Sequence, residues 1–187
     1  MKDKIRCSWC SNDQLYKNYH DIEWGVPISD DNKLFEFLIL EIFQAGLSWY
    51  TVLKKRKNFI YAFDKFDLHK ISIYDNKKIE TLMLDKGIIR NRLKITSTIM
   101  NAKNFIEIQK KHGSFYKYLL VHKKNSKLKE HLDPLNNFSP MALKICKDLK
   151  KKGFKFIGPK IIYAYLMATG VINGHQKNCY RYLELNS

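Results

Sequence analysis

The stretch from Lys147 to Leu166 reads KDLKKKGFKFIGPKIIYAYL, and it decides the architecture of the chain. It joins the basic end of one helix to an apolar second helix through Gly158-Pro159-Lys160. Proline is favoured in the first turn of a helix because that position needs no N–H donor. The pattern predicts a helix-hairpin-helix at about residues 144–168.

Working outward from the hairpin, the remaining sequence also reads as helices with short breaks, which predicts an all-α fold. Strand-like alternation appears nowhere for long. The polar stretch Lys123–Phe138 is a candidate boundary between two helical lobes, within one domain spanning 1–187. A helix is expected at about Lys33–Gln44, with its N-cap among Ser29 to Asp31. A second helix is expected to begin after Ser48 and to end near Phe63. Further helices are expected at about Ile79–Asp85, Asn91–Lys110, Ser114–Val121 and Pro140–Lys151.

Composition bounds the class of protein. The 187 residues are 45% hydrophobic, as in a globular protein, and the formal net charge is +16. Such a charge favours a polyanionic partner, with nucleic acid first and an anionic membrane surface second. A lysine-rich solvated surface without any partner is the third interpretation.

The sequence predicts no membrane span and no export signal. The longest apolar run, Leu34–Phe43, contains two glutamates and is far shorter than the roughly 20 apolar residues that a bilayer requires. The first ten residues, MKDKIRCSWC, lack the apolar core of a signal peptide. We therefore expect a cytoplasmic protein whose four cysteines are thiols or metal ligands.

The hairpin has the features of a phosphate-binding element. A helix N-terminus offers unsatisfied N–H groups and a positive dipole end, and glycine lets the backbone approach an anion closely. Gly158 and Lys160 are therefore expected to contact a DNA backbone, without reading its sequence. A tight turn between two core helices has a similar composition, so a purely structural hairpin is the alternative.

Cysteine and histidine occur near both ends of the chain. Cys7 and His20 near the start, with His175 and Cys179 near the end, provide the ligand types of a Cys2His2 zinc site. Such a structural zinc ion would tie the two termini together. Half-buried thiols and hydrogen-bonded histidines are the alternative, and Cys10 is either a competing ligand or a redox partner of Cys7.

A carboxylate stands among apolar residues in the predicted helix that ends near Gln44. Glu41 has Phe37 and Ala45 at four-residue spacing, so it needs a partner or a ligand, and a structural ion pair is the alternative. An aromatic pocket with one carboxylate suits a flat cation. The first fifty residues are rich in aromatic side chains that can line such a pocket: Trp9, Tyr16, Tyr19, Trp24, Trp49 and Tyr50.

Five segments occur in an order that resembles the 3-methyladenine DNA glycosylase I family across nearly the whole chain. YHDxEWGVP and QAGLSWxTVLKKR are highly specific to that family. The segments are RCSW (6–9), YHDIEWGVP (19–27), LEIFQAGLSWYTVLKKR (40–56), DKGIIRNRLKI (85–95) and LKKKGFKFIGPKIIYAYLMATGVINGH (149–175).

The resemblance implies a helix-hairpin-helix glycosylase fold and one structural zinc ion on Cys7, His20, His175 and Cys179. It further implies that Glu41 bonds an extruded base as the catalytic residue. Gly158 and its neighbours would hold a phosphate. The aromatic residues that would shape the pocket are Trp9, Tyr16, Tyr19 and Trp49.

The implied reaction is hydrolysis of the bond between 3-methyladenine and deoxyribose in alkylated double-stranded DNA, by a monomer. Many relatives in the wider superfamily carry a catalytic aspartate after the hairpin, where this chain has Asn173. A methylated adenine is already cationic and leaves as a neutral base, so the missing carboxylate is tolerable. The rival interpretations are a non-catalytic, zinc-stabilised DNA-damage binding module and a glycosylase with a different base preference.

Overall fold

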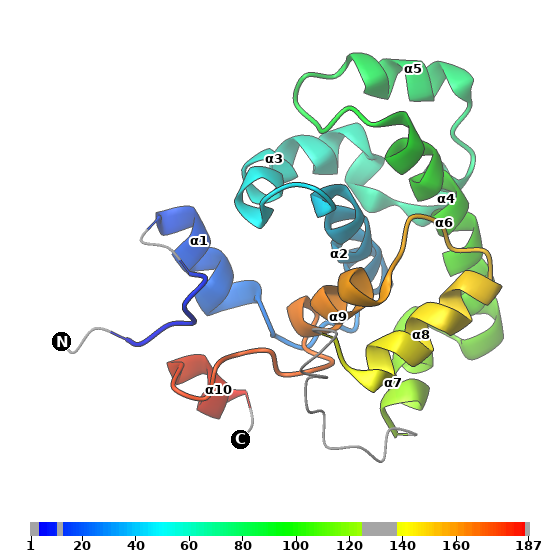
Figure 1. Ribbon diagram of the computed structural model, residues 1–187. Coiled ribbons are helices and arrows are strands. Elements are labelled where there is room, and N and C mark those ends of the chain that lie inside the picture. Colours follow the sequence, from blue (N-terminus) through cyan, green and yellow to red (C-terminus); the bar gives the residue numbers. More distant parts are fainter. Residues whose placement is uncertain (1–3, 11–12, 125–137, 186–187) are drawn as a thin grey trace.

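Helix α2 (Asp31–Gln44) lies at the centre of the molecule and is enclosed by other elements (Figure 1). Asp30 caps its start by accepting the N–H of Lys33 at 2.7 Å. Every residue from Leu34 to Phe43 is buried, Glu36 and Glu41 included. A helix that is apolar on nearly all faces is stable in water only when it is covered on all sides, so the sequence itself places α2 in the core.

The computed structural model describes residues 4–10, 13–124 and 138–185. Within these ranges the chain is helical and contains no strand, as the sequence predicts. None of the helices in these ranges has the length and apolar composition that crossing a membrane requires. Besides α2, the elements are α1 (Gln14–Asn18), the π-helix η1 (Tyr19–Glu23), α3 (Trp49–Ala62), the 3-10 turn η2 (Asp64–Phe66), α4 (Leu68–Ser72), α5 (Asn76–Leu84), α6 (Arg92–His112), α7 (Phe115–Lys124), α8 (Pro140–Lys151), α9 (Pro159–Ala168) and α10 (Tyr180–Glu184).

The longer helices confirm the sequence prediction, with ends that differ by at most three residues. Ser48 caps α3 by accepting the N–H of Thr51 at 3.2 Å, and Asn91 caps α6. The elements that the sequence did not predict are three to five residues long, too short to show a helical period. Most of the predicted lobe boundary, residues 125–137, lies outside the described part of the chain.

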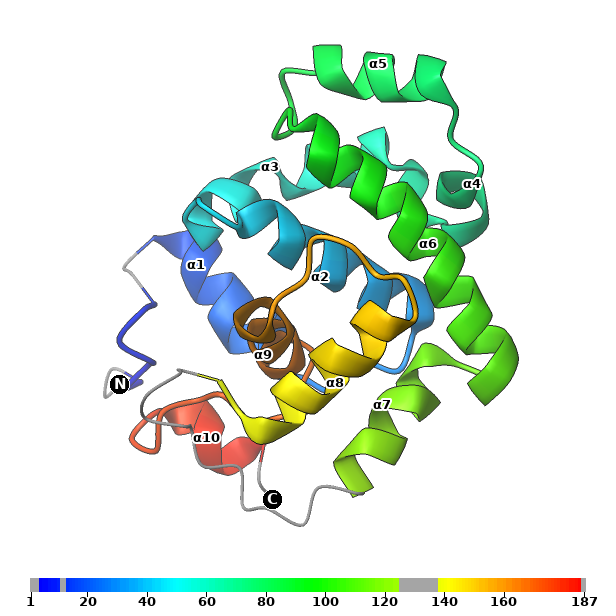
Figure 2. The same ribbon diagram turned by 45° about the vertical axis from the view of Figure 1, so that its right-hand side comes forward.

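The hairpin packs directly on the central helix. Helices α8 and α9 lie against each other, and α9 also contacts α2. The loop between α8 and α9 passes over α2 beside α6, the longest helix (Figure 2). Helix α2 also contacts α3, α6 and α7, so the element that carries Glu41 is fixed by the α8–α9 hairpin on one side and by the rest of the core on the other.

The two ends of the described chain are joined to each other. The N–H of Tyr180 donates to the carbonyl of Ile5 at 3.0 Å. The N–H of Ser8 donates to the side-chain oxygen of Gln176 at 2.8 Å, and the amide of Gln176 donates back to the Ser8 hydroxyl at 2.9 Å. These bonds hold the first segment, which carries Trp9, against the segment that follows α9.

Candidate active site and metal centre

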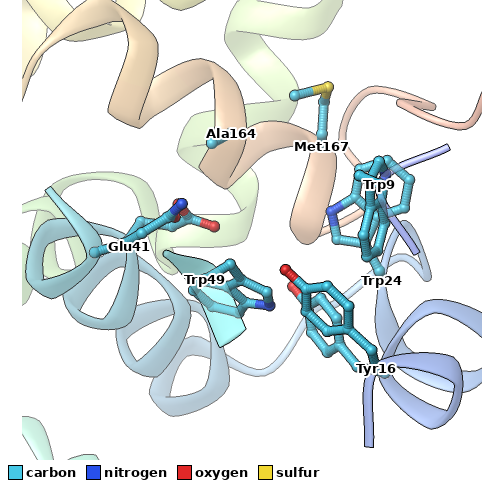
Figure 3. A pocket seen from close by; sticks show the side chains of 9 residues that line it. Trp9, Tyr16, Trp24, Glu41, Trp49, Ala164 and Met167 are labelled. Carbon is cyan, nitrogen blue, oxygen red and sulfur yellow. The ribbon is translucent and has the colours of Figure 1, made fainter. Parts of the chain in front are cut away.

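A pocket of about 300 Å³ lies between α2, α9 and the N-terminal segments (Figure 3). It has the size and largely apolar lining of a small-molecule site. Glu41 and five of the six aromatic residues singled out in the sequence line it. The lining residues are Trp9, Tyr16, Tyr19, Trp24, Glu41, Gln44, Trp49, Ala164 and Met167.

The aromatic rings of the pocket support one another edge to face. The Trp9 ring lies 5.5 Å from Tyr16 and 4.9 Å from Trp24, both in T-shaped contacts. Tyr19 and Trp49 lie 5.3 Å apart. Such mutual contacts fix ring orientation, so the walls are ready to stack on a flat ligand without rearrangement.

Tyr50, the last of the six aromatics singled out in the sequence, does not line the pocket. Its hydroxyl donates to Asp13 at 2.8 Å, and its ring packs edge-on against Tyr16 at 5.4 Å. Tyr50 therefore packs against Tyr16, a residue that lines the pocket, and does not line the pocket itself. The sequence could not separate these roles, because neighbouring helix positions point in different directions.

Glu41 extends from α2 toward the pocket, on the side opposite Trp9 and Trp24 (Figure 3). Only 5% of it is exposed, and no described residue forms a hydrogen bond or ion pair with it. Burial raises the pKa of this carboxyl to about 8. A buried carboxyl without a protein partner, in a cavity, is the arrangement expected of a ligand-binding group.

The ion pair considered from the sequence belongs to the other buried glutamate of α2. The Arg56 guanidinium donates to Glu36 at 2.6 Å and contacts Glu23 at 2.8 Å. Lys33 adds a third ion pair, 3.0 Å from Glu36. These ion pairs involve Glu36 and not Glu41, so within the described chain the Glu41 carboxyl is left for a ligand.

Three lining residues were not identified as site candidates from the sequence: Gln44, Ala164 and Met167. Gln44 lies three residues after Glu41, so helical spacing puts it on the same face and could have revealed it. Ala164 and Met167 come from α9, and no local pattern connects them to a site more than a hundred residues earlier. Trp49 contributes a buried indole N–H that has no hydrogen-bond partner within the described ranges.

The raised pKa of Glu41 predicts how stability depends on pH. Between the ordinary value of 4.5 and about 8, the unfolded chain releases this proton while the folded chain keeps it. The contribution of Glu41 to stability is therefore full below pH 4.5 and is lost as pH rises through about 8. We expect Glu41→Gln to become progressively more stable than wild type across this range, by up to a few kcal/mol.

Urea unfolding of both proteins at a series of pH values, without DNA, measures this difference. Comparing the two chains cancels the titration of every other group. A difference that stays constant with pH would contradict the placement of Glu41 in a dry pocket.

Four buried metal-ligating side chains converge beside the pocket. One ligand atom from each of Cys7, His20, His175 and Cys179 lies within 4.8 Å of the others. The sulfur of Cys179 is 3.5 Å from His20 Nε2 and 3.5 Å from His175 Nδ1. The sulfur of Cys7 is also 3.5 Å from His175 Nδ1. A tetrahedral zinc ion with ordinary bond lengths places sulfur and nitrogen ligands about 3.6 Å apart.

The outer contacts of the two histidines also suit a metal. His20 Nδ1 lies 2.7 Å from Asp21, and His175 Nε2 lies 3.1 Å from the Trp24 carbonyl, so each ring turns its other nitrogen toward the cluster. Burial lowers the pKa of His175 to about 4, which keeps its imidazole neutral. Cys10 is not among the four converging residues.

The hairpin opens onto the same pocket. A groove of about 230 Å³ runs from Lys160 and Leu47 to Glu41 and Gln44, which it shares with the aromatic pocket. Lys160 is exposed in the first turn of α9. Gly158 has an extended backbone with φ −140°, which any residue adopts, and an added Cβ there would meet no atom within 4 Å. The glycine is therefore not required by the fold, and it leaves open space in front of the helix.

Asn173 takes no part in the pocket. Its amide donates to the Tyr182 carbonyl at 3.1 Å, and its oxygen accepts the N–H of His175 at 3.1 Å. Both ends of the side chain are used to shape the segment that leads to His175. The Asn173 side chain therefore has a structural role.

Known proteins of one family match this chain over most of its length. The family model for methyladenine glycosylase matches residues 9–182. The chain is 40% identical to DNA-3-methyladenine glycosylase 1 of Escherichia coli (strain K12), over 93% of this chain and 95% of that protein. It is 36% identical to DNA-3-methyladenine glycosylase of Haemophilus influenzae, over 93% and 96%.

Solved structures share the fold as well as the sequence. A crystal structure of 3-methyladenine DNA glycosylase I matches with a TM-score of 0.86 and 40% identity, over 94% of this chain and 98% of that one. The Staphylococcus aureus enzyme, solved to explain its recognition of 3-methyladenine, matches with a TM-score of 0.85 and 34% identity, over 94% and 95%. The chain belongs to the methyladenine glycosylase family.

Proposed function

We propose that the protein hydrolyses the N-glycosidic bond of 3-methyladenine in alkylated double-stranded DNA, as the first step of base excision repair. The observation that carries this proposal is the unpaired, buried carboxyl of Glu41 in an aromatic pocket that continues into the hairpin groove. The names of the relatives support the same substrate.

The damaged nucleotide must leave the duplex to reach this pocket, because the reacting bond is inaccessible inside the base stack. The extruded base would stack among Trp9, Tyr16 and Trp49, whose rings favour a flat cation. The Glu41 carboxylate would attract its positive charge and bond its exocyclic amine. Unmodified adenine offers no charge, so it gains little from the carboxylate.

Methylation at N3 makes the base a good leaving group. The bond between C1′ and N9 breaks with its electron pair moving to the base, which departs neutral. Water then adds to the oxocarbenium-like sugar at C1′ and loses a proton, which leaves an abasic site. No lysine is among the described residues that line the base pocket, and we expect monofunctional hydrolysis without strand cleavage.

The test is release of free base from methylated duplex DNA, with the strands scored for intact abasic sites. Free 3-methyladenine and intact strands support the proposal. Tight binding of damaged DNA without any released base would instead favour a non-catalytic binding module. Release of a different modified base, identified by chromatography, would assign a different preference.

The hairpin is proposed to hold a DNA phosphate through the start of α9 and Lys160. We expect Gly158→Ala to weaken binding to an abasic-analogue duplex by about tenfold, because the added methyl group fills the space in front of the free N–H groups. The melting temperature should stay unchanged, since no atom lies within 4 Å of the new Cβ. Fluorescence anisotropy and thermal unfolding measure the two effects.

Wild-type affinity of the Gly158→Ala protein for the duplex would show that this loop does not contact a phosphate. Gly46→Ala is a less suitable control because Gly46 has a φ of +84°, which strains any other residue. Lys103→Ala, on the exposed surface of α6, is the better control for a general change in the surface.

We further propose that Cys7, His20, His175 and Cys179 hold one structural zinc ion. Four protein ligands would complete a tetrahedral shell, so the ion would supply cross-linking between the chain ends and no activated water. The tetrahedral spacing and the outer hydrogen bonds of both histidines support this. The enzyme would act as a monomeric single domain, residues 1–187, in the bacterial cytoplasm.

A further inference from the structure

Lys94 occupies a position where a lysine is costly. It lies in the first turn of α6, and only 4% of it is exposed. The positive dipole end of α6 disfavours a cation there, and burial of a charge is unfavourable without compensation. The Lys94 charge is therefore not stabilised by α6, and the partners of Lys94 must lie on other elements.

One set of partners is the end of α2. The Lys94 ammonium donates to the carbonyl of Phe43 at 2.8 Å and to that of Ala45 at 2.7 Å. Carbonyls at the end of a helix have no partner within it, and the negative dipole end favours a cation. These contacts fix the last turn of α2, which carries Glu41 and Gln44 into the base pocket.

The other partner is the hairpin loop. The ammonium lies 5.6 Å from the ring centre of Phe156, within the range of a cation–π contact. Phe156 has a φ of +57°, a left-handed conformation that phenylalanine rarely adopts, so surrounding contacts must hold it. The residue remains 40% exposed at the hairpin.

Asn101 anchors the same loop two helical turns further along α6. Its oxygen accepts the N–H of Lys155 at 2.7 Å, and its amide donates to the carbonyl of Lys155 at 3.1 Å. One face of α6 therefore holds the hairpin loop at two points and the end of α2 at one. Figure 2 shows this loop passing beside α6 and over α2.

We propose that Lys94 is a positioning residue for base excision. By binding the end of α2 and the hairpin loop at one point, it sets the distance between the phosphate grip and the base pocket. A nucleotide held at its phosphate then delivers its base to Glu41. The inference rests on the proposed function.

The test compares Lys94→Met with wild type and with Lys103→Met, which removes the same charge from the exposed face of α6. We expect Lys94→Met to lower the single-turnover rate of base release at least tenfold, because small misplacements of reacting groups are costly in rate. Its melting temperature should fall, because the carbonyls of Phe43 and Ala45 lose their donor, so the rates are compared per folded molecule. Lys103→Met should match wild type in both.

Two further variants separate positioning from general support. Lys94→Arg keeps the charge and the donors, so it should recover part of the rate. Phe156→Ala should slow base release by itself but add little when combined with Lys94→Met, because both changes break the same link.

A wild-type rate in Lys94→Met overturns the proposal. So does a loss of rate that disappears when rates are scaled to the folded fraction, which would make Lys94 a structural residue only. Fully additive effects of Lys94→Met and Phe156→Ala overturn the link through the loop. If wild type itself releases no base, the proposed function fails, and this outcome is distinct from the others.

Discussion

Glu41→Gln is expected to lower the single-turnover rate of 3-methyladenine release by about 100-fold or more, in the range of lost electrostatic stabilisation in water-excluded sites. Glutamine keeps the shape of the side chain and one accepting oxygen but cannot carry a negative charge. The carboxyl has no protein partner within the described chain, so its charge is available for the cationic base. Quantifying free base from methylated duplex at enzyme excess measures the effect.

Glu36→Gln is the matched control. Glu36 lies on the same helix and is buried to the same degree, 6% exposed against 5% for Glu41, but it pairs with Arg56. Its replacement should lower stability, because a buried guanidinium loses a charged partner, and leave the rate per folded molecule intact. Equal losses of rate in both variants would show that Glu41 acts only through the packing of α2.

The pH profile provides a second readout of Glu41. Burial raises the pKa of the Glu41 carboxyl to about 8, so this carboxyl is protonated in most free enzyme molecules at pH 7. If the carboxylate is the active form, kcat/KM of wild type rises with pH up to about 8 and then levels off. The glutamine variant should lack this step, and a retained step would assign the titration to another group.

The sequence predicted the fold well where helices are long. The uninterrupted apolar surface of Leu34–Phe43 required a central helix, and Ser48 and Asn91 mark helix starts by a capping chemistry that is local. Elements of three to five residues, such as α4, depend on tertiary packing against α6 and leave no periodic signal.

The site was predictable where its chemistry is unusual and not where it is ordinary. A glutamate inside an apolar helix is conspicuous, and so are cysteines and histidines at both chain ends. Ala164 and Met167 are common in any core helix, and only the packing of α9 on α2 makes them pocket walls. Likewise, Lys94 looks like one more solvated lysine until its contacts across the core are known.

Loss of a ligand of the proposed zinc ion should have the largest effect on stability. We expect Cys179→Ser to lower the melting temperature by about 10 °C or more. Structural zinc sites contribute on the order of 10 kcal/mol, and each kcal/mol shifts the melting temperature of a domain of this size by about 2–4 °C. Thermal unfolding and the zinc content of the purified protein, by mass spectrometry, give the two readouts.

Cys10→Ser is the control for this prediction, because Cys10 is near the cluster in sequence but outside the four converging residues. It should keep one zinc ion per chain and a wild-type melting temperature. Loss of zinc from this variant would make Cys10 a ligand, and a wild-type protein without zinc would exclude the metal centre.

The proposed zinc site should also affect activity, although it lies outside the reacting groups. Trp9 lines the base pocket two residues after Cys7, and its ring lies 5.2 Å from His20. Release of the metal would free the N-terminal segment and loosen this wall, so binding of free 3-methyladenine should weaken together with the fall in melting temperature. Unchanged base affinity in a folded, zinc-free Cys179→Ser protein would show that the hydrogen bonds between Ser8 and Gln176 hold Trp9 without the metal.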